Sequence, residues 1–95
     1  MTENELSRIA VDIAFKIHNE LGPGLLESVY ESAFCYELDK INLSYLRQEG
    51  IKVYYDGAFL DIGFRADIII ENKLLIEIKS VVAVEKVFHK TVLTY

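Results

Sequence analysis

The chain has 95 residues, of which 52% are hydrophobic and 26% charged, and its net charge is −5 at pH 7. This composition is typical of one folded globular domain and speaks against a disordered tail. No apolar run reaches the roughly 18 residues that span a bilayer, and the N-terminus lacks the features of a signal peptide. The single cysteine, Cys35, cannot form an internal disulfide, so we expect a reducing compartment, the cytoplasm.

The negative charge is concentrated at the N-terminal end. Residues 1–42 contain three Lys/Arg and eight Asp/Glu, whereas residues 73–95 contain four lysines and two glutamates. The negative net charge speaks against a protein that covers nucleic acid without sequence preference, because proteins of that class carry a basic surface. It does not exclude a metal-dependent phosphodiesterase, since such an enzyme needs acidic ligands for its metal.

Two amphipathic helices are predicted in the first half of the chain. Apolar residues at three- and four-residue spacing indicate a helix over residues 3–21, which Gly22-Pro23-Gly24 ends. A second helix is predicted over residues 25–42. Its expected apolar stripe consists of Leu26, Val29, Tyr30, Ala33, Phe34 and Ile41. Glu37 falls within this stripe. We favour a structural role for it, in an ion pair with a cation, over a role as a further acid of the functional site.

Strand patterns follow these helices. Residues 50–55 are predicted as a first strand and Asp56-Gly57 as a hairpin turn. Residues 59–70 form a long extended stretch, which we expect to be broken or bulged near Gly63.

A third strand is predicted over residues 74–79, after a short turn at Glu71-Asn72-Lys73, and helical character returns from about Val84. The predicted element order is therefore ααβββα. The chain stops at Tyr95 within the last helical pattern, so we expect a truncated sequence in preference to a face that a partner covers. Such a C-terminal helix, or an open sheet edge, would be the contact for a homo-oligomer.

Charged residues share one face of the predicted third strand. The two-residue period of a strand places Glu77 and Lys79 on one face and leaves the other apolar. The apolar face consists of Leu74, Ile76 and Ile78, and it is expected to pack against the helices. A three-residue turn places Asp67 opposite Glu77, whereas a two-residue turn sends the two acids to different faces. We adopt the three-residue register, because it gives Asp67 a reason to interrupt an Ile-rich strand.

Two opposed carboxylates repel each other unless a cation lies between them. Mg²⁺ suits such a site, because it takes few protein carboxylates and completes its shell with waters and phosphate oxygens. It could polarise a scissile phosphate, while Lys79 orients or deprotonates a water or stabilises charge on the phosphate. The alternative is a solvent-exposed hairpin in which an Asp–Lys or Glu–Lys pair explains all three residues, and on spacing alone this alternative is the more common one.

The second helix opens with Gly24-Leu25-Leu26-Glu27-Ser28-Val29-Tyr30, the pattern G-x-x-E-x-x-Y. Further motifs follow in order: Gln48, Tyr55-Asp56-Gly57, Phe64-Arg65-Ala66-Asp67 and Glu77-Ile78-Lys79-Ser80. Together they resemble the small bacterial and archaeal proteins of the GxxExxY family over nearly the whole chain. That family is assigned by fold to the PD-(D/E)xK nuclease superfamily.

This resemblance implies an α/β fold with a restriction-endonuclease-like core, in which two N-terminal helices precede a three-stranded, mostly antiparallel sheet and a C-terminal helix. Residues 1–95 would then be a single nuclease domain that lacks the end of its C-terminal helix and its last strand. Asp67, Glu77 and Glu27 would hold Mg²⁺ or Mn²⁺, and Lys79 would be the catalytic lysine.

Two further positions are assigned by the resemblance. Tyr30, one helical turn after Glu27, would border the site or hold Glu27 in place, with simple core packing as an equal alternative. For Glu27 itself, the structural alternative is a favourable acid in the first helical turn. The family tends to carry a glutamine where this chain has Thr91, and a threonine there would contact substrate or water less well.

The leading hypothesis is a Mg²⁺-dependent nuclease that hydrolyses phosphodiester bonds in DNA, with RNA as the less favoured substrate. The competing hypothesis is an inactive member of the same fold that binds nucleic acid or oligomerises. The acidic balance, Thr91 and the missing C-terminal segment favour the second hypothesis. A third interpretation is a purely structural α/β domain.

Overall fold

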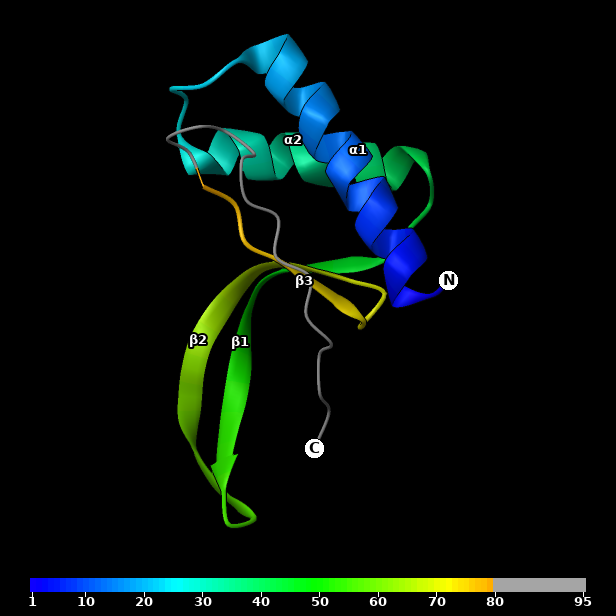
Figure 1. Cartoon of the computed structure of the whole chain (residues 1–95). Coiled ribbons are helices and arrows are strands. Elements are labelled where there is room, and N and C mark those ends of the chain that lie inside the picture. Colours follow the sequence, from blue (N-terminus) through cyan, green and yellow to red (C-terminus); the bar gives the residue numbers. More distant parts are fainter. Residues whose placement is uncertain (80–95) are drawn as a thin grey trace.

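The computed structural model describes residues 1–79, whose elements are α1 (Glu3–Leu21), α2 (Glu27–Lys40), β1 (Tyr45–Tyr55), β2 (Ala58–Ile70) and β3 (Leu74–Ile76). The strands form one antiparallel sheet in the order β1-β2-β3. The two helices lie together on one side of the molecule, and β1 and β2 extend away from them as a curved arm (Figure 1). This part of the chain confirms the predicted order ααβββ, while the predicted C-terminal helix and Thr91 lie outside the described residues.

α1 occupies the predicted residues and begins with a capping box. The Thr2 hydroxyl accepts the Glu5 N–H at 3.1 Å, and the Glu5 carboxylate accepts the Thr2 N–H at 2.7 Å. At the other end Gly22 adopts φ 69°, and its N–H donates to the His18 carbonyl at 2.9 Å. The helix buries Leu6, Ala10, Ile13, Ala14 and Ile17. No helix within residues 1–79 is long and apolar enough to cross a membrane.

α2 begins two residues later and ends two residues earlier than predicted. Gly24 has φ 101° and Leu26 stays extended, so the first helical residue is Glu27. The predicted apolar stripe was therefore wrong at Leu26 and Ile41, which lie outside the helix and are 75% and 47% exposed, and at Val29, which is 40% exposed. The buried residues are Tyr30, Glu31, Phe34, Cys35 and Leu38, a face that follows four-residue spacing.

β1 and β2 form the predicted hairpin. Asp56 and Gly57 have φ 53° and 79°, and Tyr55 pairs with Ala58, which makes a two-residue turn. β1 starts five residues before the predicted position, because its N-terminal half pairs with the Ile-rich end of β2.

The expected irregularity at Gly63 is confirmed. Ile51 pairs with Phe64 and Lys52 with Ile62, so Gly63 is the extra residue of a β-bulge. A Cβ atom at Gly63 would collide with the side chain of Val53. The bulge therefore brings the two strands close at a position that favours glycine.

The turn between β2 and β3 has the predicted three-residue register. Ile70 pairs with Leu74, and Glu71 and Asn72 both adopt left-handed φ values, 53° and 54°. β3 ends at Ile76, three residues earlier than predicted. The pairing of β3 with β2 stops there. The Ile78 N–H, which would be the next to bond to β2, donates to the side chain of Asp67 instead of to a backbone carbonyl of β2.

The main core lies between the helices and the sheet. It takes the fully buried Tyr30 and Phe34 from α2 and, from the sheet side, Ile68, Ile70, Leu74, Ile76 and Ile78. The predicted apolar face of the third strand thus packs as expected. Glu37 lies outside this core and pairs with Lys16 at 3.2 Å and with Lys40 at 3.4 Å, the ion pair that its sequence position favoured.

Candidate active site

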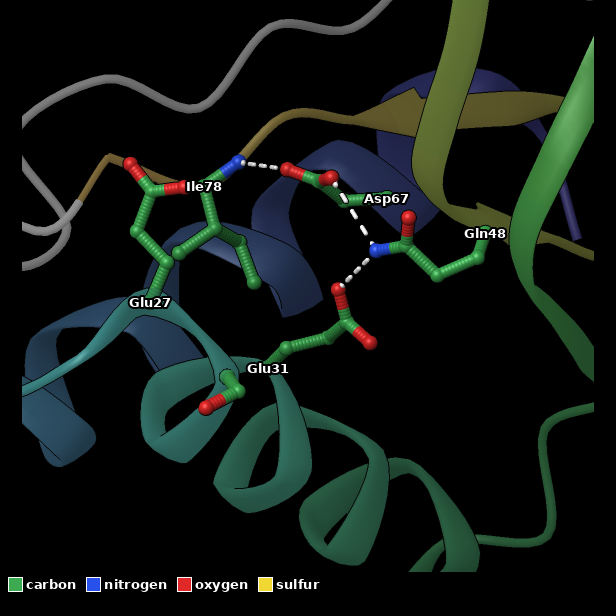
Figure 2. Close-up of a pocket in the computed structure, with 6 residues that line it drawn as sticks. Glu27, Glu31, Gln48, Asp67 and Ile78 are labelled. Atoms are coloured by element: carbon green, nitrogen blue, oxygen red, sulfur yellow. Dashed lines mark hydrogen bonds between the residues drawn. The ribbon is translucent and has the colours of Figure 1, made fainter.

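A pocket of about 390 Å³ lies where the start of α2 faces the sheet (Figure 2). Its lining residues are Glu27, Ser28, Glu31, Gln48, Asp67 and Ile78. Three of these six carry carboxylates, and they come from two elements, α2 and β2. A concave site with several acids is where a cation can be bound.

Asp67 ties the segment after β3 to the sheet. One of its oxygens, Oδ2, accepts the backbone N–H of Ile78 at 2.8 Å. The other, Oδ1, accepts a hydrogen bond from the amide Nε2 of Gln48 at 3.3 Å. Asp67 therefore points into the pocket with one oxygen held by the backbone.

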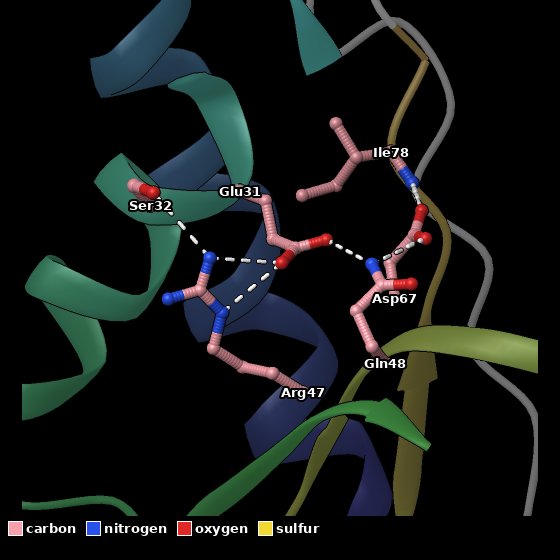
Figure 3. A network of polar contacts seen from close by, with 6 residues as sticks. All are labelled: Glu31, Ser32, Arg47, Gln48, Asp67 and Ile78. Atoms are coloured by element: carbon pink, nitrogen blue, oxygen red, sulfur yellow. Dashed lines mark hydrogen bonds and ion pairs between the residues drawn. The ribbon is translucent and has the colours of Figure 1, made fainter. Parts of the chain in front are cut away.

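Glu31 is the acid that the sequence analysis missed. It is only 7% exposed, and its Oε2 accepts hydrogen bonds from Nε and Nη2 of Arg47 at 3.0 and 2.9 Å (Figure 3). Its Oε1 accepts the Gln48 amide at 2.5 Å. A buried carboxylate needs such a cation beside it, and these hydrogen bonds raise the pKa of Arg47. The available signal was its place one helical turn after Glu27, where side chains four residues apart share a face.

Gln48 lies in β1 between two residues that pair with β2, Arg47 with Ile68 and Glu49 with Ala66, and so it stands opposite Asp67. It is a left-handed residue within a strand, with φ 50°, a conformation that is uncommon for any residue except glycine. Its carbonyl accepts a hydrogen bond from Nη1 of Arg65 at 2.7 Å, which holds the backbone there. From the sequence, Gln48 is singled out only by the family resemblance.

Glu77 and Lys79 do not line this pocket. They pair with each other at 3.3 Å, and each side chain is 46% exposed. Ile78, the residue between them, lines the pocket and donates to Asp67. The structure thus brings Asp67 and Glu27 to one pocket, together with Glu31 and Gln48, and leaves Glu77 and Lys79 beside it.

Tyr30 is fully buried and does not line the pocket. Its hydroxyl donates to the Gly22 carbonyl at 2.7 Å and accepts the Leu25 N–H at 2.9 Å. Both partners belong to the loop between α1 and α2. Tyr30 therefore sets the path of the chain directly before Glu27.

The oxygen donors of the pocket suit a hard divalent cation. Within the described residues no group of three or more His, Cys, Asp or Glu side chains is arranged to hold a metal. Two carboxylate oxygens, of Glu31 and Asp67, nevertheless lie within 3.3 Å of one atom, Nε2 of Gln48. Because a hard divalent cation can be bound through one or two carboxylates, with waters and phosphates as its other ligands, this donor set is compatible with a divalent metal.

The two helices and the antiparallel sheet are those of an α/β, restriction-endonuclease-like fold. The family model of the PD-(D/E)XK nuclease superfamily matches residues 4–95, and the chain belongs to this superfamily. No curated protein and no solved structure matched the chain. Membership supports a nuclease-like function and nucleic acid as the class of ligand, and nucleases of this superfamily generally use divalent metals.

Proposed function

We propose that this domain is a metal-dependent nuclease that hydrolyses phosphodiester bonds in DNA, with RNA as the less favoured substrate and Mg²⁺ or Mn²⁺ as cofactor. The observation that carries the proposal is the approach of Asp67 and Glu31 to one atom in a pocket that Glu27 also lines. The finer assignment to the GxxExxY group belongs to the proposal and rests on the motif from Gly24 to Tyr30. The cytoplasm remains the expected location, on the ground of the free thiol of Cys35.

In this proposal Asp67 and Glu27 hold the metal, Glu31 adds a carboxylate from α2, and Glu77 joins them as the sequence predicted. The bound metal would supply Lewis-acid polarisation of the scissile phosphate. The Arg47 guanidinium orients Glu31, because it occupies the carboxylate oxygen that faces away from Gln48.

Lys79 must leave Glu77 before it can act on a substrate. Both side chains of this pair are 46% exposed, and an ion pair in water contributes less than about 1 kcal/mol. A substrate phosphate could therefore compete for Lys79, which would then stabilise charge on that phosphate or orient the attacking water. The exchange would also free the Glu77 carboxylate for the metal.

The test is a cleavage assay on plasmid and oligonucleotide DNA, and on RNA, with Mg²⁺, with Mn²⁺ and with a chelator. Wild-type protein is expected to cleave only with metal, and Asp67→Asn and Lys79→Ala are expected to lose at least about 100-fold in rate. Lys52→Ala serves as the matched control, because Lys52 is an exposed lysine on the arm. If wild type and Lys79→Ala leave the same background cleavage, the proposal fails.

The second candidate is an inactive module of the same fold that binds nucleic acid or oligomerises. Two observations favour it: the net charge of −5, and the ion pair in which Glu77 balances the positive charge of Lys79, the expected catalytic lysine. An inactive module would show no cleavage, no metal-dependent rise in Tm, and either a DNA complex or a dimer in sedimentation. A dimer could form at the sheet edge, where β1 is the outer strand.

A further inference from the structure

The carboxylates of Asp67 and Glu31 share one pattern of hydrogen bonds. In each of them one oxygen accepts from a donor other than Gln48, and the other oxygen accepts from the Gln48 amide. For Asp67 this other donor is the Ile78 N–H, and for Glu31 it is the Arg47 guanidinium. The remaining oxygens, Asp67 Oδ1 and Glu31 Oε1, both accept hydrogen bonds from the same amide nitrogen of Gln48 (Figures 2 and 3). The NH₂ group of Gln48 thus uses both of its hydrogens on the two acids.

The backbone of Gln48 is built to hold its side chain there. Its φ of 50° departs from that of its strand neighbours, and Arg65 donates to its carbonyl at 2.7 Å. A left-handed backbone conformation costs free energy in a residue other than glycine, so it persists only where the surrounding contacts hold the residue in that conformation. The cost falls at the one position of β1 that stands opposite Asp67.

A neutral amide in this position reduces the repulsion between two carboxylates without adding a charge of its own. A divalent cation would do so more strongly, and its ligand oxygens lie at about 2.1 Å. Asp67 Oδ1, at 3.3 Å from the amide nitrogen, would have to approach by about 1 Å to bind a cation at that point. The terminal torsion of a glutamine side chain is broad, so the amide can turn aside without a large rotamer cost.

We infer that Gln48 is a positioning residue whose amide occupies the place of the metal in the metal-free site, holds Asp67 and Glu31 together there, and is displaced when the cation binds. This inference rests on the proposed function, because it requires the pocket to bind a divalent metal. It adds that metal binding competes with the Gln48 amide, so the wild-type affinity is lower than the two acids alone would give.

The experiment measures the Kd for Mn²⁺ by titration calorimetry and the Tm at rising Mn²⁺, with wild type, Gln48→Leu and Gln48→Gly. Leucine removes the amide and keeps the bulk, while glycine removes the side chain and tolerates the left-handed backbone. Both variants are expected to have a lower Tm in chelator and a Kd about tenfold tighter, which corresponds to about 1.4 kcal/mol. The Tm gained at a given Mn²⁺ concentration should rise accordingly.

Asn72→Leu and Asn72→Gly are the matched controls, because Asn72 has φ 54° in an exposed turn and does not line the pocket. They should leave the Kd for Mn²⁺ unchanged. If the wild type binds Mn²⁺ and both Gln48 variants bind it with equal or lower affinity, the inference about Gln48 is wrong. The nuclease proposal is then unaffected. A wild type whose Tm and calorimetric trace do not respond to Mn²⁺ overturns both.

Discussion

Arg47 holds Glu31 with two hydrogen bonds to the same carboxylate oxygen, at 3.0 and 2.9 Å from Nε and Nη2. The second oxygen of Glu31 is thereby left to face the pocket and Gln48. The pair joins α2 to β1 across 16 positions of sequence, so one contact both stabilises the packing of the helix on the sheet and orients an acid of the candidate site.

Replacing Arg47 with Met should destabilise the protein by about 1–2 kcal/mol, because the largely buried Glu31 loses its counter-charge. The value lies below that of a fully buried pair, since the Arg47 side chain is 42% exposed. The free energy of unfolding in urea measures it. Arg8→Met, at an exposed position of α1, is the control and should change stability by less than about 0.5 kcal/mol. Equal effects of the two substitutions would contradict the role of the pair.

Tyr30→Phe should cost about 1–2 kcal/mol and leave the ring packing intact. The loss comes from the hydroxyl of this fully buried side chain, because its removal leaves the Gly22 carbonyl and the Leu25 N–H without their shared hydrogen-bond partner. Thermal and urea unfolding provide the measurement. Tyr36→Phe removes the hydroxyl of an exposed tyrosine on the same helix and should be neutral. A neutral Tyr30→Phe would show that the loop does not depend on this bridge.

Gly63→Ala should destabilise the β1–β2 arm by about 1 kcal/mol, because its Cβ collides with Val53. In a Val53→Ala background the same substitution should be neutral or slightly stabilising, since the obstructing methyl groups are gone and alanine restricts the unfolded chain. A double-mutant cycle on the urea midpoint measures the coupling. The same loss in both backgrounds would mean that the clash does not set the cost.

Acid should weaken the clamp between Ser44 and Glu71. The Ser44 hydroxyl and its N–H, the latter at 2.8 Å, donate to Glu71 and hold the pKa of that carboxyl below its ordinary value of 4.5. Since the folded pKa is the lower one, this stabilisation is complete above pH 4.5 and is lost as pH falls through the folded pKa.

Glu71→Gln should therefore lose less stability than wild type on acidification from pH 4.5 to about pH 2.5, because the amide oxygen still accepts from Ser44 and does not titrate. Unfolding free energy against pH gives the slopes. Glu49→Gln, at an exposed position of β1, should keep the wild-type slope. Parallel curves for Glu71→Gln and wild type would exclude the clamp as a source of acid sensitivity.

Much of the fold was predictable because its causes are local. The period of the apolar residues predicted α1, and glycines with left-handed φ ended it. Asp56-Gly57 predicted a two-residue turn, and the placement of Asp67 in an Ile-rich strand predicted the three-residue register after Ile70. The start of α2 was predicted less well, because Tyr30 reaches back to Leu25 and Gly22 from within the helix.

What the sequence determined by itself was the order ααβββ within residues 1–79 and the three-residue register between β2 and β3, while Glu27 was assigned to the site of Asp67 only through the family resemblance. Only the tertiary structure decided that Glu31 and Gln48 join them, while Glu77 and Lys79 pair with each other. The reason is physical: periodicity assigns a side chain to a face, but the packing of α2 on β1 decides which faces meet. That packing depends on contacts such as Arg47 with Glu31, which join residues far apart in the chain.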